Sequence, residues 1–291
     1  MFEGVFTALV TPFRDGQVDV PTLRDLVERQ IAAGVDGLVP CGTTGEAMSL
    51  DWDEHALVVR TVVEQARGRL PVVAGAGSGS TGDTVALCRI AREAGADGVL
   101  LVCPYYVRPQ QAGVEGHFRR VLQEVPIPAM LYNIPGRTAF DLEAATLARL
   151  ADVPHVVAIK EATGNVLRAQ QIVARCGDRF AVLSGDDALT LGMLAVGGRG
   201  VVSVTSNLLP GAVREVVQAW RAGDVEGARR AHLRLLAVHE ALFVESNPAP
   251  IKYAMACAGL LRPEVRLPLA WPADGSRERI DAALAQCGLR P

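Results

Sequence analysis

The chain has 291 residues, of which 49% are hydrophobic and 21% charged, so it is long enough to bury a large core in one α/β domain. Its formal net charge is −3 and both signs are interspersed, which argues against nucleic acid or an anionic membrane as a partner. Because the first residues carry no basic segment and no apolar run approaches about 18 residues, we expect a cytoplasmic enzyme without a membrane span.

Eight short apolar runs recur along the chain, each followed by a stretch of helix length. Their apolarity is continuous rather than alternating, which is typical of parallel strands buried on both faces. Strand and helix alternating eight times, with right-handed crossovers, predict a parallel (β/α)8 TIM barrel. The runs are residues 5–10, 37–41, 71–75, 98–103, 129–132, 156–159, 180–183 and 200–204.

The strand signals stop at about residue 224. The remaining residues read as helices interrupted by Pro248, Pro250, Pro263 and Pro268. We therefore divide the chain into a catalytic barrel, residues 1–224, and a C-terminal helical region, residues 225–291. This appendage continues from the last barrel helix and is not predicted to be an independent domain.

Polar residues gather where the predicted strands end. In a (β/α)8 barrel the carboxyl ends of the strands and the loops after them form the active-site face. Each signal alone is weak, since a threonine pair between glycines is usually a turn and a tyrosine at a strand end is usually core. Together they indicate a catalytic rim, which comprises Thr43 and Thr44, Tyr105 and Tyr106, residues 132–138, and Lys160.

Lys160 has the most specific chemistry of this group. The chain has only two lysines, Lys160 and Lys252, against 27 arginines. A guanidinium keeps its proton, whereas an ammonium at the end of a buried strand can be desolvated until its amine is free to attack a ketone. Lys160 is therefore predicted to form a Schiff base, the alternative being a lysine that snorkels to solvent. Lys252, in the C-terminal region, is expected to be structural.

Motifs along nearly the whole chain match one known family. They are residues 8–12, 42–46, 105–106, 132–138, 159–165, 184–187, 202–205 and 247–250. With them the chain resembles the class I pyruvate-dependent aldolases of the dihydrodipicolinate synthase family. The resemblance implies a lyase that condenses pyruvate with L-aspartate 4-semialdehyde to give 4-hydroxy-tetrahydrodipicolinate, in diaminopimelate and lysine biosynthesis.

The resemblance also implies how the protons move. Lys160 would form the imine with pyruvate, and Tyr132, Thr43 and Tyr106 would relay protons, a role that suits a hydroxyl because it both donates and accepts. In the family the tyrosine at Tyr106 reaches into the site of a neighbouring subunit. A homodimer or homotetramer, a dimer of dimers, is therefore expected.

Three further residues are implied to bind substrate. Thr44 and the backbone of Val202 would hold the pyruvate carboxylate, and Arg137 would pair with the carboxylate of the aldehyde. Arg137 favours the synthase over sibling aldolases that cleave N-acetylneuraminate or a 2-keto-3-deoxy sugar acid, which remain the alternative. A catalytically idle barrel that serves as a ligand sensor or assembly partner is a third hypothesis, disfavoured because an idle site has no need for Lys160, Tyr132 and the pair of Thr43 and Thr44 together.

No cofactor and no metal are expected. The six cysteines lack C-x-x-C spacing and the five histidines lack ligand spacing. Residues 75–79 are rich in glycine but do not have the spacing of a dinucleotide fingerprint, and no glycine loop precedes a phosphate-binding lysine. The cysteines are read as reduced core residues of a cytoplasmic protein.

Feedback by L-lysine is expected to be weak or absent. In lysine-sensitive members of the family a cleft binds the inhibitor through a histidine, a glutamate, an asparagine and a tyrosine, and the aligned positions are His55, Asp83, Gly79 and Tyr105. Asp83 is one methylene shorter than glutamate, and Gly79 has no side-chain amide. Trp52 lies close in sequence and is expected to narrow the cleft.

Overall fold

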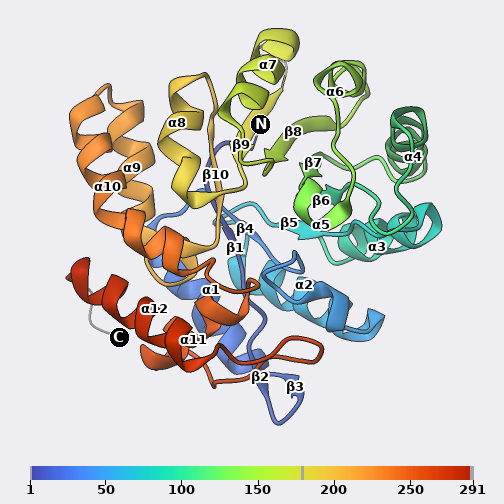
Figure 1. Cartoon of the computed structure of the whole chain (residues 1–291). Coiled ribbons are helices and arrows are strands. Elements are labelled where there is room, and N and C mark those ends of the chain that lie inside the picture. Colours follow the sequence, from blue (N-terminus) through green and yellow to red (C-terminus); the bar gives the residue numbers. More distant parts are fainter. Residues whose placement is uncertain (1, 178–179, 289–291) are drawn as a thin grey trace.

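Eight parallel strands form one sheet within residues 2–177 and 180–288, the part of the chain that the computed structural model describes. Hydrogen bonds join them in the order β4-β1-β10-β9-β8-β7-β6-β5, and a bridge between Leu38 and Val72 brings the two edges together. The predicted (β/α)8 TIM barrel is thus confirmed (Figure 1). Its strands are β1 (Gly4–Ala8), β4 (Gly37–Val39), β5 (Val73–Gly75), β6 (Gly98–Val102), β7 (Ala129–Asn133), β8 (Val156–Glu161), β9 (Ala181–Ser184) and β10 (Gly200–Ser203).

Each strand is apolar on both faces because it separates two hydrophobic cores. Phe6 and Val202 pack in a cluster inside the barrel, whereas their neighbours Val5 and Val201 pack in a larger cluster toward the helices. Successive side chains alternate between the two clusters, as the pleat requires. The same alternation decides which polar residues at the strand ends face the barrel interior.

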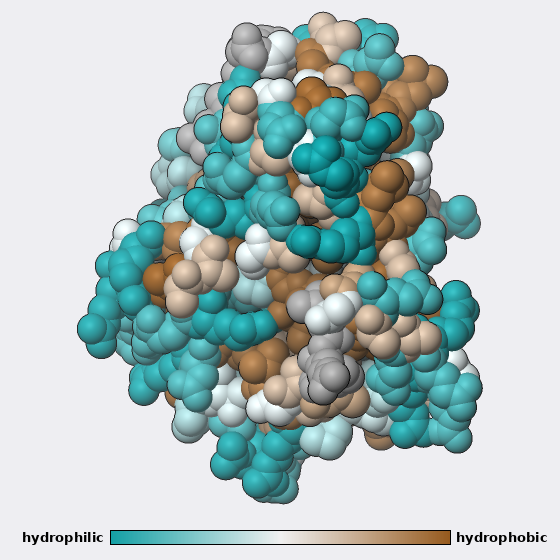
Figure 2. All heavy atoms as spheres, turned by 90° about the vertical axis from the view of Figure 1, so that its left-hand side faces the viewer, coloured by the Kyte–Doolittle hydropathy of each residue, from teal (hydrophilic) through white to brown (hydrophobic). Residues whose placement is uncertain are grey.

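Helices surround the strands and turn hydrophilic side chains outward, as Figure 2 shows for the face that carries α9 and α10. Local signals fix their ends: Asp19 caps the first helix and Gly34 ends it in the left-handed conformation. The helices are α1 (Val20–Ala33), α2 (Trp52–Ala66), α3 (Thr81–Glu93), α4 (Gln111–Glu124), α5 (Pro135–Thr138), α6 (Ala144–Leu150), α7 (Val166–Cys176), α8 (Thr190–Ala195) and α9 (Pro210–Arg221), then α10 (Val225–Ala241), α11 (Ala249–Cys257) and α12 (Asp274–Gln286). Short 3-10 helices lie at η1 (Ala47–Ser49), η3 (Asp187–Leu189) and η4 (Thr205–Asn207).

A small hairpin in the first strand-to-helix connection was not predicted. It pairs β2 (Phe13–Arg14) with β3 (Gln17–Val18) in antiparallel register. The turn has positive φ at Asp15 and Gly16, 54° and 80°, the two-residue geometry that an Asp-Gly pair favours. The strands are too short for an alternating pattern to reveal them, so only the turn residues could have done so.

The C-terminal helices pack against the barrel and against one another. Helix α10 contacts α9 and α12, and α11 contacts α12. The division at residue 224 stays a prediction, and residues 289–291 of the predicted helical region lie outside the described part of the chain. Among the described residues, no helix is long and apolar enough to cross a membrane.

Candidate active site

A cavity of about 340 Å3 opens at the carboxyl end of the barrel. Its lining comes from the turn after β4, from β6 and β7, from α5 and from the segment before α11. Thr43, Tyr132 and Arg137 line it, as the sequence predicts for a shared rim, and so does Asn247, which had no predicted role. The cavity therefore joins segments that are far apart along the chain.

Lys160 lies on β8 directly opposite Tyr132 of β7. The lysine is 5% exposed, and its Nζ lies 4.4 Å from the centre of the Tyr132 ring. Lys160 does not itself line the cavity, but it stands next to Tyr132, which does. The fold leaves room for its side chain, since a Cβ on Gly185 would lie 3.1 Å from both Cγ and Cε of Lys160.

Burial changes the chemistry of this amine. It lowers the pKa of Lys160 to about 8, because water no longer solvates the ammonium. The carboxylate of Asp187 opposes the shift and the guanidinium of Arg137 adds to it. Near neutral pH a useful fraction of the amine is therefore free to act as a nucleophile.

Tyr132 is 4% exposed, and burial raises the pKa of its phenol to about 12. The charge of Arg137 and a hydrogen bond with Thr43 act in the opposite direction. The phenol thus keeps its proton near neutral pH and has both a hydroxyl partner and a nearby amine. This arrangement can pass a proton once a positive charge forms beside it.

Neither Thr44 nor Val202 is part of the cavity lining. Thr44 is 2% exposed and its Oγ1 accepts a hydrogen bond of 2.9 Å from Nδ2 of Asn247. Val202 is fully buried on β10. Asn247 also accepts, at its backbone oxygen, a 3.2 Å hydrogen bond from Nη2 of Arg137, so one residue touches both predicted carboxylate-binding side chains.

Tyr106 is not brought into the cavity of its own chain. Its side chain is 93% exposed and its backbone has a φ of 72°. Tyr105, by contrast, lines the cavity and its hydroxyl donates to Sδ of Met48 at 3.1 Å. A relay that includes Tyr106 needs the site of another copy.

A buried ion pair that the sequence did not reveal holds the turn after β4 that contains Thr43 and Thr44, called the threonine turn below. Lys252 of α11 reaches Glu46, two residues after Thr44, and both side chains are at most 1% exposed. The second oxygen of Glu46 accepts from the backbone N–H of Arg266 at 2.9 Å, and the Lys252 ammonium lies 4.2 Å from the centre of the Phe13 ring. Lys252 lies in a C-terminal helix as expected, yet its contact is with the rim.

A smaller cavity, of about 160 Å3, adjoins the first. Three of the four positions aligned with the lysine cleft, His55, Asp83 and Tyr105, line it together with Trp52. Burial lowers the pKa of His55, whose Nε2 lies 2.7 Å from the oxygen of Gly75. The residues of the predicted cleft thus share one space, and no side chain from position 79 can enter it.

Within the described residues no cluster of His, Cys, Asp or Glu could hold a metal ion.

Comparison with known proteins gives consistent matches. The family model "Dihydrodipicolinate synthetase family" matches residues 1–287. The chain is 50% identical to the 4-hydroxy-tetrahydrodipicolinate synthase of Pelobacter propionicus over 99% of this chain and 100% of that one. It is 54% identical to the protein of the same name from Sorangium cellulosum, covering 99% and 96%. The structure of dihydrodipicolinate synthase from Aquifex aeolicus superposes with a TM-score of 0.97 at 42% identity, covering 99% of both chains.

Proposed function

This chain belongs to the dihydrodipicolinate synthetase family, and from that premise we propose that it condenses pyruvate with L-aspartate 4-semialdehyde to give 4-hydroxy-tetrahydrodipicolinate. The reaction is a step of diaminopimelate and lysine biosynthesis. The observation that carries the proposal is the Lys160 amine, buried beside Tyr132 with a pKa lowered to about 8. The relatives' names do not favour the alternative of a sugar-acid aldolase.

The chemistry begins at Nζ of Lys160. The free amine adds to the ketone carbon of pyruvate, and loss of one water leaves a protonated imine. This cation withdraws electrons from the adjacent methyl group, which releases a proton and becomes an enamine. The enamine carbon then attacks the aldehyde carbon of the second substrate, and the amine of that substrate displaces Lys160 as the ring closes.

Tyr132 is the proton carrier nearest the imine. Its raised pKa keeps the phenol protonated until an iminium forms at Nζ of Lys160, which lies 4.4 Å from the centre of its ring, and that charge would favour the phenolate. The hydroxyl of Thr43 would accept a proton from Tyr132 and donate one in turn. We assign the third hydroxyl to Tyr106 of a neighbouring copy, because in its own chain this side chain points to solvent. A homodimer, alone or paired into a tetramer, would then be the catalytic unit.

Two anion sites orient the substrates. Thr44, held by Asn247, and the backbone at Val202 would bind the pyruvate carboxylate, and Arg137 would bind the carboxylate of the aldehyde. We place the enzyme in the cytoplasm, where its six cysteines would remain thiols.

Trapping the imine tests the assignment. Borohydride added with pyruvate should inactivate the protein and modify one peptide, which contains Lys160. Lys252 provides an internal control, since it is fully buried and paired with Glu46. Reduction at Lys252, or none at all, would contradict the mechanism. Turnover measured side by side with L-aspartate 4-semialdehyde and with N-acetylneuraminate distinguishes the synthase from its siblings.

A further inference from the structure

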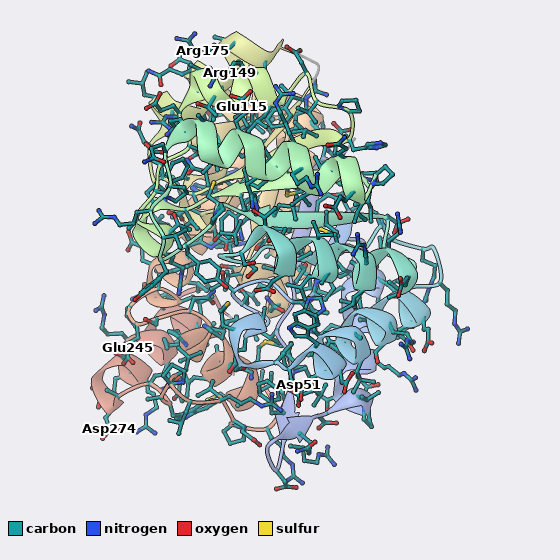
Figure 3. The ribbon with its side chains drawn as sticks, turned by 90° about the vertical axis from the view of Figure 1, so that its right-hand side faces the viewer. Asp51, Glu115, Arg149, Arg175, Glu245 and Asp274 are labelled. Carbon is teal, nitrogen blue, oxygen red and sulfur yellow. The ribbon has the colours of Figure 1, made fainter. Side chains whose placement is uncertain are left out.

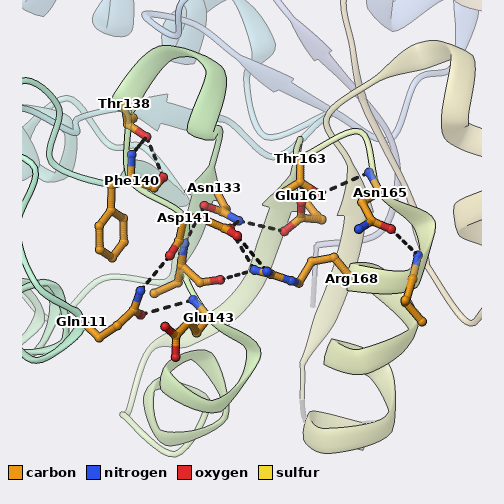
Figure 4. Close-up of polar contacts among 12 residues, drawn as sticks. Gln111, Asn133, Thr138, Phe140, Asp141, Glu143, Glu161, Thr163, Asn165 and Arg168 are labelled. Atoms are coloured by element: carbon orange, nitrogen blue, oxygen red, sulfur yellow. Dashed lines mark hydrogen bonds and ion pairs between the residues drawn. The ribbon is translucent and has the colours of Figure 1, made fainter.

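A polar network lies behind the strands that carry Lys160 and Tyr132. Asn133 and Glu161 directly follow these residues and pair with each other in the same register. Because side chains alternate along a strand, they face away from the barrel interior and toward the helices. Figure 4 shows them meeting the segment after α5 and a side chain of α7.

Asn133 joins three parts of the rim. Its Nδ2 donates to Oδ1 of Asp141 at 2.9 Å and to Oε2 of Glu161 at 3.2 Å, and its Oδ1 accepts from the backbone N–H of Leu142 at 3.0 Å. The Asn133–Asp141 bond closes a loop of nine residues, 133–141, that contains all of α5. Arg137 lies at the exposed end of that loop.

Arg168 of α7 fixes the base of the loop. It donates from Nη1 and Nη2 to the two oxygens of Asp141, at 2.8 and 2.7 Å, and from Nη1 to the backbone oxygen of Leu142 at 2.7 Å (Figure 4). Such two-pronged, charge-assisted pairs fix geometry as well as contribute energy. Its guanidinium also opposes the rise that burial causes in the pKa of Glu161. Without Arg168, the carboxyl groups of Asp141 and Glu161 would share one amide, and Asp141 would lose the cation that pairs with it.

A change in this network should leave the position of Lys160, where the imine forms, nearly unchanged. Lys160 is held by strand hydrogen bonds on both sides, to β7 and to β9, within the closed barrel. Arg137 lies outside the sheet, and among the described residues its side chain donates one hydrogen bond, of 3.2 Å, to the backbone oxygen of Asn247. A shift at the base of the loop therefore moves Arg137 more than it moves Lys160.

We infer that Arg168 is a positioning residue for the aldehyde, acting through Asp141 and Asn133 on Arg137. It touches no substrate. This role rests on the proposed function, since it concerns the second substrate of that reaction.

Arg168→Met tests the role, with Arg149→Met as the matched control. Arg149 also lies on a barrel helix and pairs with a carboxylate, Glu115 at 2.8 Å, but on the outer surface (Figure 3). Arg168→Met should raise KM for L-aspartate 4-semialdehyde roughly tenfold, the size expected for one lost charge-assisted contact. KM for pyruvate and the rate of borohydride trapping should change by less than about twofold. Arg168→Lys should recover part of the loss, and the control should change neither constant.

A double-mutant cycle separates positioning from general support of the fold. If Arg168 acts through Arg137, then Arg168→Met adds no further rise in aldehyde KM once Arg137→Ala is present. Additive effects, or equal rises for both substrates, overturn the inference. Should Arg168→Met fail to fold, the isosteric Asp141→Asn replaces it. This variant should likewise raise KM for the semialdehyde and spare KM for pyruvate, and an unchanged KM for the semialdehyde then refutes the role. A wild-type protein that does not turn over the semialdehyde instead refutes the proposed function.

Discussion

Replacing Lys160 by methionine should stabilise the protein while abolishing turnover. Methionine is close to lysine in length and carries no charge, so it removes the amine without leaving a large void. Asp187, which loses a nearby cation, keeps hydrogen bonds from the Ser203 hydroxyl and from the backbone N–H groups of Val204 and Thr205. The catalytic amine is thus expected to cost stability in the resting protein.

The magnitude follows from the pKa. The pKa of Lys160 falls from 10.5 to about 8 on folding, and at about 1.4 kcal/mol per pH unit the protonated lysine costs roughly 3 kcal/mol at pH 7. The unfolded chain binds the proton more tightly than the folded one, so the free energy of unfolding of the wild type rises with pH between about 8 and 10.5. The advantage of Lys160→Met should therefore shrink to about 1 kcal/mol at pH 9.5 and vanish above 10.5.

Urea denaturation at pH 7 and at pH 9.5, at equal protomer concentration, measures both values. Lys160→Arg, which keeps the buried charge, is the control and should be less stable than wild type at both pH values. If Lys160→Met raised the free energy of unfolding by the same amount at the two pH values, packing alone would account for the effect. If it did not raise the free energy of unfolding at pH 7, the claim that Lys160 is desolvated would be refuted.

Four further outcomes are expected. Lys252→Met leaves the buried Glu46 carboxylate unpaired and should lower the free energy of unfolding by about 3–5 kcal/mol, measured by urea titration. Arg137→Ala should raise KM for the semialdehyde tenfold or more and spare KM for pyruvate, whereas equal rises would mean that Arg137 supports the fold. Mixing Tyr106→Phe subunits with subunits that lack the reactive lysine should restore some activity, and failure in verified mixed dimers would exclude the shared site. L-Lysine should inhibit weakly because Gly79 offers no amide, and half-inhibition at submillimolar lysine would contradict that reading.

The barrel could be predicted from the sequence because each of its strands is marked by a signal within a short stretch of residues. Continuous apolar runs mark strands that separate two cores, and each of the eight runs overlaps a strand of the structure. Lys160 could be found the same way, since a lysine that closes such a run must end at the active-site face. The Asp15–Gly16 hairpin shows the limit, because its strands are too short to leave a pattern.

The contacts of the supporting residues could not be predicted, since no local pattern shows which distant residues they reach, even for Asn247, which lies in a matching motif. Asn247 bonds to Thr44 across 203 residues and Lys252 reaches Glu46 across 206. Neither residue lies in a periodic pattern that points to the rim. Arg168 looks in the sequence like any helix arginine, and only its partners distinguish it from Arg149 on the surface.

The ion pair between Glu46 and Lys252 has a consequence during synthesis on the ribosome. The threonine turn emerges 206 residues before the lysine that holds it, which at about 5–20 residues per second is a wait on the order of 10–40 s. A nascent or truncated chain that ends before Asn247 already contains Lys160 and all eight strands, but its turn still lacks the bonds from Asn247 and Lys252. Translation therefore delivers the reactive amine early and the support of its substrate pocket last, so prematurely terminated chains should carry the nucleophile without a working site.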